Sequence, residues 1–177
     1  DANEIGAESL VLRDPDVDAA VMEVARGGML CSGIGFRECD VACCLNVSGD
    51  HLGIGGIDTI EQLAEIKRLP VEIAKQAAVL NADDPQCLRM ADYTDAERLC
   101  YVTMRAEHPL VKQHIDAGGQ AFVLEQGING HMITIYGSDT HIPLLWTHLI
   151  PATLEGRALH NVQNAMFAAA LAYNMGI

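Results

Sequence analysis

Polar side chains that could do chemistry gather in segments that each follow an apolar run: residues 23–28, 46–51 and 81–84. Glu23 offers a carboxylate oxygen, which suits a hard cation such as Mg²⁺. The paired glycines after Arg26 would let the backbone approach a phosphate. A carboxylate at a strand end, paired with Arg26, is an equally ordinary explanation. The first segment therefore leaves a functional and a structural interpretation open.

Ordinary structural roles also compete with chemistry in the other two segments. Asp50 and His51 fit an Asx turn as well as a polar site. Asn81 and the acidic pair Asp83 and Asp84 fit a turn followed by a helix cap. Each segment, taken alone, permits a ligand without requiring one.

Further polar candidates lie on expected helices. Lys67 by itself is typical of a solvated helix residue. Asn161 and Asn164 lie one helical turn apart, so their amides could contact the edge of a nucleobase or simply cap a helix. These residue types are compatible with nucleotide binding but do not establish it.

Several common catalytic motifs are absent from the sequence. A Walker A loop needs lysine after glycine, but the lysines of this chain follow Ile66, Ala74 and Val111. The glycine fingerprint of dinucleotide-binding folds, the nucleophile elbow of hydrolases and the H-E-x-x-H zinc motif are also missing. The chain therefore does not hold nucleotide phosphates with a Walker A loop of its own.

Composition narrows the possible partners. The 177 residues are 50% hydrophobic and carry 11 basic against 24 acidic side chains, a formal net charge of -13. This charge repels phosphate backbones and anionic lipid surfaces, so we expect neither nucleic-acid nor membrane binding. No apolar run reaches membrane-spanning length and no secretory signal is visible, so the expected location is the cytoplasm.

The cysteine pattern predicts free thiols rather than disulfides. There are six cysteines without a C-x-x-C pair or zinc-ribbon spacing, so we expect buried, reduced thiols. Cys43 and Cys44 are adjacent inside an apolar run, and strand geometry would send their side chains to opposite faces of a sheet.

The candidates need a scaffold, and the hydrophobic pattern predicts one with a mainly parallel sheet. Residues 17–24 and 40–46 are nearly continuous apolar runs, which indicate strands covered on both faces. Further strands are expected at 77–80 and 99–104. Residues 121–125 and 131–136 alternate around Asn129-Gly130, a strong hairpin signal that 142–145 could extend.

Helix signals separate these strands. Thr59 with Gln62 is a capping-box pattern, Pro70 should disturb the helix that follows, and Asp84 with Pro85 marks another start. Helices are also expected at 109–117 and 161–174. The predicted fold is α/β, a mainly parallel sheet with helices on both faces and a small antiparallel β unit over 120–146. In such a sheet the polar segments meet at the carboxyl edge of the strands, which is where ligands bind.

Taken together, four segments resemble the ATP-binding central domain of the Mur ligase superfamily. They are residues 21–30, 46–53, 81–85 and 160–165, and the wording E-x-A-R-G-G, D-H-L-G-x-G-G-I-D-T and G-R-A-x-x-N-V-x-N-A is the most specific part. The similarity extends from about Gly6 to Ile177. Each motif is weak alone, whereas all of them in the family's order make a strong match.

The resemblance implies an ATP-dependent ligase that forms an amide bond through an acyl phosphate. Glu23 matches the family's magnesium-binding glutamate and His51 its metal-site histidine. Lys67 falls where many members carry a carbamylated lysine, which would act as a carboxylate-like ligand beside Mg²⁺. By this resemblance His51 and Lys67 are the expected catalytic residues, and ATP and Mg²⁺ the expected cofactors.

The resemblance also implies nucleotide contacts and substrates. Asn161 and Asn164 match adenine-contacting asparagines, with His160 adjacent, and Asn81 and Asp83 match a loop near the nucleotide. The motif wording is most similar to the branch understood to join the α-amine of arginine to the aspartate β-carboxylates of a polyaspartate backbone. Members acting on peptidoglycan precursors or on folate polyglutamate, and a degenerate non-catalytic interaction module, are the alternatives.

Departures from the family pattern also carry expectations. The family's phosphate loop and its third lobe have no counterpart in these residues, so 1–177 is expected to be a single, partial central domain. We therefore expect the fragment to be inactive by itself. Loss of the strand that carries the phosphate loop should leave apolar sheet edges, so we expect the fragment either to form a homo-oligomer or to repack across the gap.

Overall fold

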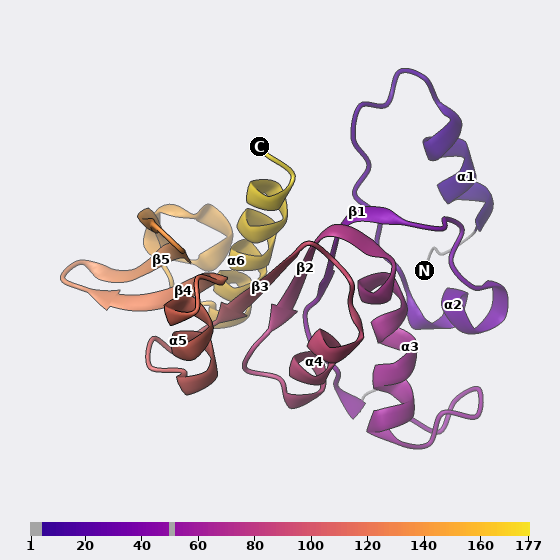
Figure 1. The fold of residues 1–177 in the computed structure, drawn as a ribbon, viewed down its shortest axis with the longest axis horizontal. Helices are drawn as coiled ribbons and strands as arrows, with labels where there is room; N and C mark the ends of the chain where they lie inside the picture. The colour runs from indigo at the N-terminus through magenta and orange to yellow at the C-terminus, as the bar shows by residue number, and fades with distance from the viewer. Residues whose placement is uncertain (1–4, 50–51) are drawn as a thin grey trace.

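The computed structural model describes residues 5–49 and 52–177, and it shows one six-stranded sheet with the strands in chain order (Figure 1). The parallel part comprises β1 (Cys39–Cys44), β2 (Ala74–Asn81), β3 (Arg98–Thr103) and β4 (Gln120–Gly127). The strands β5 (Gly130–Gly137) and β6 (Thr140–Trp146) are antiparallel. The predicted α/β fold with an antiparallel β unit is confirmed.

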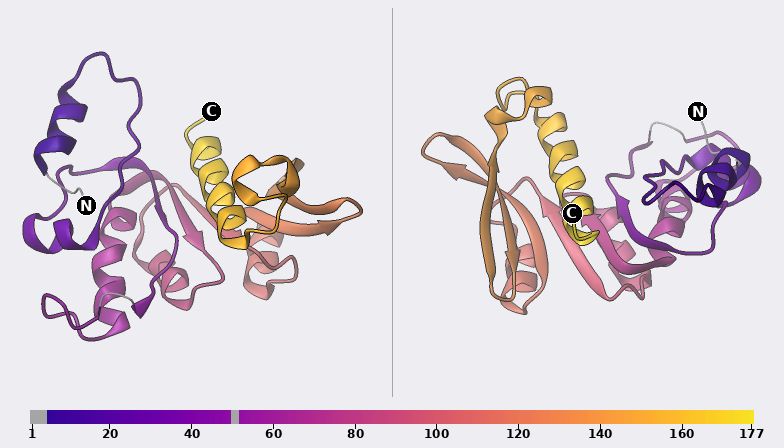
Figure 2. Two further views of the ribbon diagram at one scale, coloured as in Figure 1. Left: turned by 180° about the vertical axis from the view of Figure 1, so that it is seen from behind. Right: turned by 90° about the horizontal axis from the view of Figure 1, so that it is seen from above.

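Helices cover both faces of the sheet, as predicted. On one face lie α3 (Ile60–Glu72), α4 (Pro85–Arg89), the 3-10 turn η2 (Met90–Tyr93) and α5 (Pro109–Asp116). On the other face α6 (Leu159–Asn174) crosses β1, β2 and β3. Figure 2 shows α6 separated from α3 and α4 by the sheet. Two short 3-10 turns, η3 (Thr147–Leu149) and η4 (Pro151–Thr153), lie between β6 and α6 in the chain.

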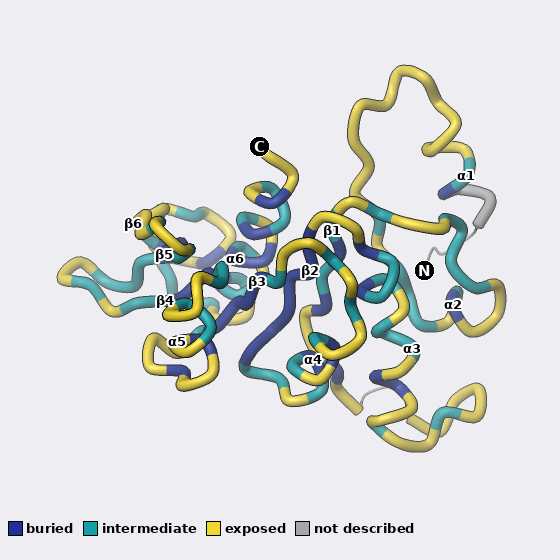
Figure 3. The backbone as a smooth tube through the Cα atoms, viewed as in Figure 1, coloured by how far each residue is buried: buried dark blue, intermediate teal, exposed yellow. Residues whose placement is uncertain are grey.

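Strand alternation divides the buried side chains into two cores. Leu80 and Tyr101 face the α3–α4–α5 side, whereas their neighbours Val79 and Cys100 face α6. The central strands β2 and β3 are consequently buried along most of their length (Figure 3). Runs of small and β-branched residues are what a strand with two covered faces requires.

Local signals place several element ends where the sequence predicts them. The Thr59 side chain accepts from the backbone of Gln62 and the reciprocal bond is present, so α3 begins with a full capping box. Pro70 does not end α3: it lies inside the helix, which continues through it for two more residues to Glu72. The hairpin at Asn129-Gly130 is confirmed, and β4 also pairs with β3, which makes the antiparallel unit part of the main sheet.

The predicted strand at 17–24 is wrong. This segment is irregular and mostly exposed, with Val21 96% accessible, and it leads into a helix, α2 (Arg26–Ser32). Among the described residues β1 pairs only with β2, so the apolar run has no strand to bond with. The segment stands away from the sheet together with α1 (Ile5–Arg13), a helix that the pattern did not indicate (Figure 1).

The cysteines are free, as expected, but they are not all buried. Cys44, Cys87 and Cys100 are buried, whereas Cys31 is exposed at the end of α2. Cys43 and Cys44 pack into opposite cores, which confirms the prediction for that pair. In the described part of the chain no helix is long and apolar enough to cross a membrane.

Candidate active site

The carboxyl edge of the parallel strands is built around Asn81, the last residue of β2. Its side-chain Nδ2 donates to the carbonyl of Leu45 at 2.6 Å, just beyond the end of β1. Its Oδ1 accepts from the backbone of Asp83 at 2.9 Å. Asn81 is 4% accessible, so both ends of this amide are committed to holding two neighbouring loops together. These bonds give Asn81 a positioning role whether or not a nucleotide lies nearby.

Asp84 connects the same two loops through its carboxylate. One oxygen accepts from the backbones of Gln86 at 2.8 Å and Cys87 at 3.2 Å and caps α4, as the sequence predicts. The other oxygen accepts from the backbone of Val47 at 2.7 Å. A single side chain thus fixes the start of α4 relative to the loop after β1.

Asp83 is held from the next strand. Its Oδ1 accepts from the Thr103 hydroxyl at 2.8 Å and from Arg105 Nε at 2.9 Å, and its Oδ2 accepts from the backbone of Met104 at 2.7 Å. The Asp83 carboxylate is therefore well satisfied and lies beside a cation that is itself largely exposed. Thr103 and Arg105 donate to Asp83 but were not predicted from the sequence, since no local pattern marks them.

These loops border a hollow of about 460 Å³. It is lined by residues from the loops after β1 and β2, from the starts of α3 and α4, and from α6: Val47, Ile60, Asn81, Asp83, Asp84, Pro85, Gln86 and Gln163. Asn81 and Asp83, both predicted site residues, come together here. Gln163 was missed, although it stands between the two asparagines of the last motif.

Lys67 points from α3 toward the loop after β1, where its Nζ donates to the carbonyl of Asn46 at 3.1 Å. This bond is solvent-exposed, so the ammonium lies at the carboxyl edge of the sheet while it remains accessible to water. Its positive charge also reaches the buried thiols of Cys44 and Cys87. His51, the other expected catalytic residue, lies outside the described residues.

The electrostatics around Lys67 differ between those two thiols. The pKa of Cys44 lies below its ordinary value, because the Cys87 thiol donates a hydrogen bond to it and, to a smaller extent, because of the charge of Lys67, while burial acts in the opposite direction. The pKa of Cys87 is raised, since it donates that bond and is buried. Cys44 is consequently the more acidic thiol of the two.

The described residues do not test the predicted magnesium ligand set as a whole, because His51 lies outside them. Glu23 is exposed in the irregular segment before α2, so the idea of a strand-terminal carboxylate is wrong. Within 5–49 and 52–177, no group of three His, Cys, Asp or Glu side chains lies close enough to hold a metal ion. An unmodified Lys67 ammonium has no lone pair for Mg²⁺, so only its carbamate would fit the expected oxygen ligand set.

The last motif lies at the start of α6, and its asparagines are placed differently. Asn161 Nδ2 donates to the carbonyl of Ala152 at 2.6 Å, which ties α6 to the preceding turn η4. The helix begins at Leu159 without a side-chain cap, so Asn161 is not its cap. His160 and Asn164 are exposed, and Asn164 keeps its amide at the surface, one turn from Asn161.

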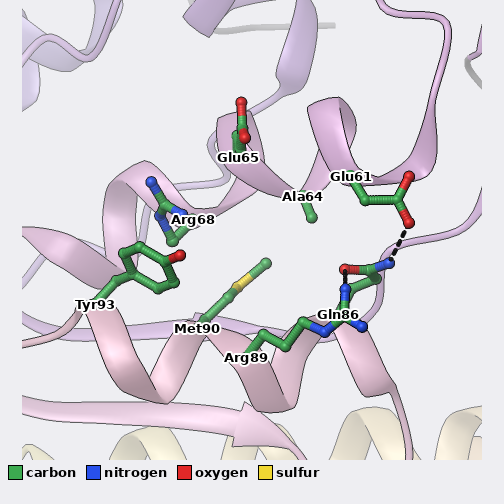
Figure 4. A pocket seen from close by; sticks show the side chains of 8 residues that line it. All are labelled: Glu61, Ala64, Glu65, Arg68, Gln86, Arg89, Met90 and Tyr93. Atoms are coloured by element: carbon green, nitrogen blue, oxygen red, sulfur yellow. Dashed lines mark hydrogen bonds between the residues drawn. The ribbon is translucent and has the colours of Figure 1, made fainter.

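A second, smaller hollow between α3 and α4 is less suited to a ligand. Arg68 lies over the Tyr93 ring at 3.6 Å and pairs with Glu72, and Gln86 bridges Glu61 and Arg89 (Figure 4). Its charged groups therefore largely satisfy one another. The hollow at the carboxyl edge, where backbone and side-chain groups of several elements meet, remains the candidate active site.

Comparison with known proteins gives the fold and the site a family context. The Mur ligase middle domain family matches residues 2–172. Cyanophycin synthetase of a Nostoc species is 45% identical over 166 residues, 93% of this chain and 18% of the relative. Cyanophycin synthetase of a Synechocystis species is 42% identical over 96% of this chain and 19% of the relative. That of Trichormus variabilis is 44% identical over 93% of this chain and 18% of the relative. The resemblance to the Mur ligase superfamily is confirmed, and these relatives are all named cyanophycin synthetases.

Proposed function

We propose, because this chain belongs to the Mur ligase middle domain family, that it supplies the ATP site of an ATP-dependent ligase that forms an amide bond. The chain spans only 18–19% of the length of the curated relatives named above, so this activity is proposed for the longer polypeptide. The observation that carries the proposal is the hollow at the carboxyl edge of β1 and β2, whose lining includes Gln163 of the last family motif.

The relatives' name supports cyanophycin synthesis as the reaction. We propose that a β-carboxylate of a polyaspartate backbone takes the γ-phosphoryl group of ATP and releases ADP. The α-amine of arginine then attacks the acyl carbon, phosphate leaves, and the ammonium protons pass to solvent. The net change is one amide bond formed and one phosphoanhydride bond broken.

The residues of this chain would bind and orient rather than react covalently. We assign Asn161, Asn164 and His160 to the adenine side, with Asn81 and Asp83 near the nucleotide. Asn81, Asp84 and Lys67 hold the loop after β1, and a fixed loop presents its groups without a reorganisation cost. Glu23, His51 and carbamylated Lys67 would hold Mg²⁺, which when bound neutralises phosphate charge.

Replacement of Glu23 in the full-length protein tests the assignment. With Glu23→Ala we expect arginine incorporation to be lost, while Glu38→Ala, which removes another exposed carboxylate, leaves the rate unchanged. An unimpaired rate in Glu23→Ala would refute the role of Glu23.

The identity of the amine is tested with competing substrates. Purified full-length enzyme is offered ATP with arginine and polyaspartate, with UDP-linked muramyl peptide acceptors, or with folate and glutamate. We expect ADP release with the first set alone. ADP release with either of the other sets would favour the peptidoglycan or folate branch. Absence of ADP release with all three sets would favour a non-catalytic module.

A further inference from the structure

Two buried thiols from different elements meet beside the candidate active site. Cys44 is the last residue of β1 and Cys87 lies in α4, and their Sγ atoms are 3.5 Å apart. The two residues are 5% and 0% accessible. Both are free thiols.

The backbone holds this pair in place. Asp84 binds the amide of Cys87 through one oxygen and the amide of Val47, three residues beyond Cys44, through the other. Strand alternation turns Cys44 toward the α4 side and Cys43 away from it. The proximity of the thiols is therefore fixed by the same contacts that build the site.

A disulfide is geometrically accessible from this arrangement. A disulfide bond length is about 2.05 Å, so the sulfurs need to close by about 1.5 Å. Residues buried at this level are reached by small oxidants when the local structure opens. Cys87 lies in α4, a helix of five residues, so a local opening of this single short helix is enough to expose its thiol.

We propose that Cys44 and Cys87 form a redox-sensitive dithiol, oxidised by a peroxide to an intramolecular disulfide that slows the ligase reaction. The regulatory part rests on the proposed function. The sulfur of Cys44 attacks one peroxide oxygen and releases water, which leaves a sulfenic acid. The sulfur of Cys87 then attacks that sulfur and releases a second water. Two thiols and one hydrogen peroxide thus give one disulfide and two waters.

Formation of the Cys44–Cys87 disulfide would affect the candidate active site through the residues that follow Cys44. The carbonyl of Leu45 accepts from Asn81, the carbonyl of Asn46 accepts from Lys67, and the amide of Val47 donates to Asp84. Movement of Cys44 toward α4 strains each of these bonds, since they lie one to three residues from it. The loop would then present Lys67 and Asn81 in altered positions.

The disulfide itself is tested by mass spectrometry of the full-length protein. Reduced protein is treated with hydrogen peroxide, alkylated and digested, and we expect a cross-linked Cys44–Cys87 peptide that dithiothreitol releases. Cys87→Ser and Cys44→Ser should abolish it, whereas Cys31→Ser, which removes an exposed thiol at the end of α2, should not. Absence of the Cys44–Cys87 cross-link in peroxide-treated wild-type protein would overturn the proposal.

ADP release under the same treatment tests the regulatory part. We expect wild type and Cys31→Ser to lose most of their turnover and to regain it with dithiothreitol, while Cys87→Ser keeps it. A cross-link with unchanged turnover would overturn the switch. A cross-link in a protein without any ligase activity would leave the dithiol standing and refute the proposed function, so the two failures are distinguishable.

Discussion

Asp83 and Asp84 are sequence neighbours whose carboxylates hold different parts of the site. Asp83 binds the loop after β3, whereas Asp84 joins the start of α4 to the loop after β1. The sequence predicts the cap from Asp84 and Pro85, because capping is a local property. The bond to Val47 could not be predicted, since it depends on which strands are neighbours.

Loss of the Asp84 carboxylate should loosen α4. Replacing an N-cap aspartate by alanine costs about 1 kcal/mol, and the amide of Val47 also loses its partner, so we expect α4 amides in Asp84→Ala to exchange roughly 5–30-fold faster. Hydrogen–deuterium exchange of the full-length protein measures this. Asp95→Ala, at an exposed carboxylate, serves as the control. Unchanged exchange in α4 would show that the cap contributes nothing.

Tyr136 offers a residue-level prediction about pH. Burial raises its pKa to about 12, and the hydrogen bond that its hydroxyl donates to Glu125 at 2.6 Å adds to the shift. Because the folded pKa exceeds the unfolded value, Tyr136 stabilises the fold below about pH 10, and this contribution is lost as pH rises through the folded pKa. Alkaline absorbance titration should show a late phenolate step that Tyr136→Phe removes. An unchanged titration curve would contradict the assignment.

At the scale of elements, local chemistry predicts boundaries and long-range pairing decides strands. Thr59, Asp84 and Asn129-Gly130 mark a helix start, a cap and a hairpin correctly, since each signal acts within a few residues. Residues 17–24 have the composition of a buried strand but lie exposed, because a strand also needs a neighbour. The same limit explains Glu23, whose expected place depended on that strand.

The turn before α6 is an element whose glycine should be indispensable. Gly156 has a φ of 82°, and a Cβ there would lie 2.7 Å from the Thr147 hydroxyl oxygen. In Gly156→Ala we expect the local stability of this turn to fall by more than about 1 kcal/mol. The Ala158 amide, which donates to the carbonyl of Thr153, should then exchange faster. Gly27→Ala is the control, since a Cβ at Gly27 meets nothing within 4 Å. Equal exchange in both variants would mean that the turn tolerates a side chain.

At the scale of the whole molecule, the site is assembled from segments far apart in the chain. The position of this candidate site at the carboxyl edge of the sheet was predictable, because parallel strands bring their polar ends to one rim. The roles within it were less predictable. The Asn81 amide bonds to the neighbouring loops and the Asn161 amide to Ala152, contacts that the sequence did not indicate, and it also did not indicate Gln163 in the lining of the hollow. Side-chain direction at helix and strand ends depends on the neighbours, which a single sequence does not reveal.

The charge of the whole chain makes a final prediction about nucleotide binding. With a net charge of -13, the chain repels the phosphates of ATP, so its proposed affinity depends on Mg²⁺ as the compensating charge. In calorimetric titrations of the full-length protein, removal of Mg²⁺ with a chelator should weaken ATP binding by about tenfold or more, since ~1.4 kcal/mol of lost attraction is enough. Added monovalent salt should then restore part of the loss, because it screens the remaining repulsion. Adenosine, which has no phosphate, should bind equally with and without Mg²⁺. ATP binding that is insensitive to the chelator would show that phosphate recognition is carried by protein cations instead.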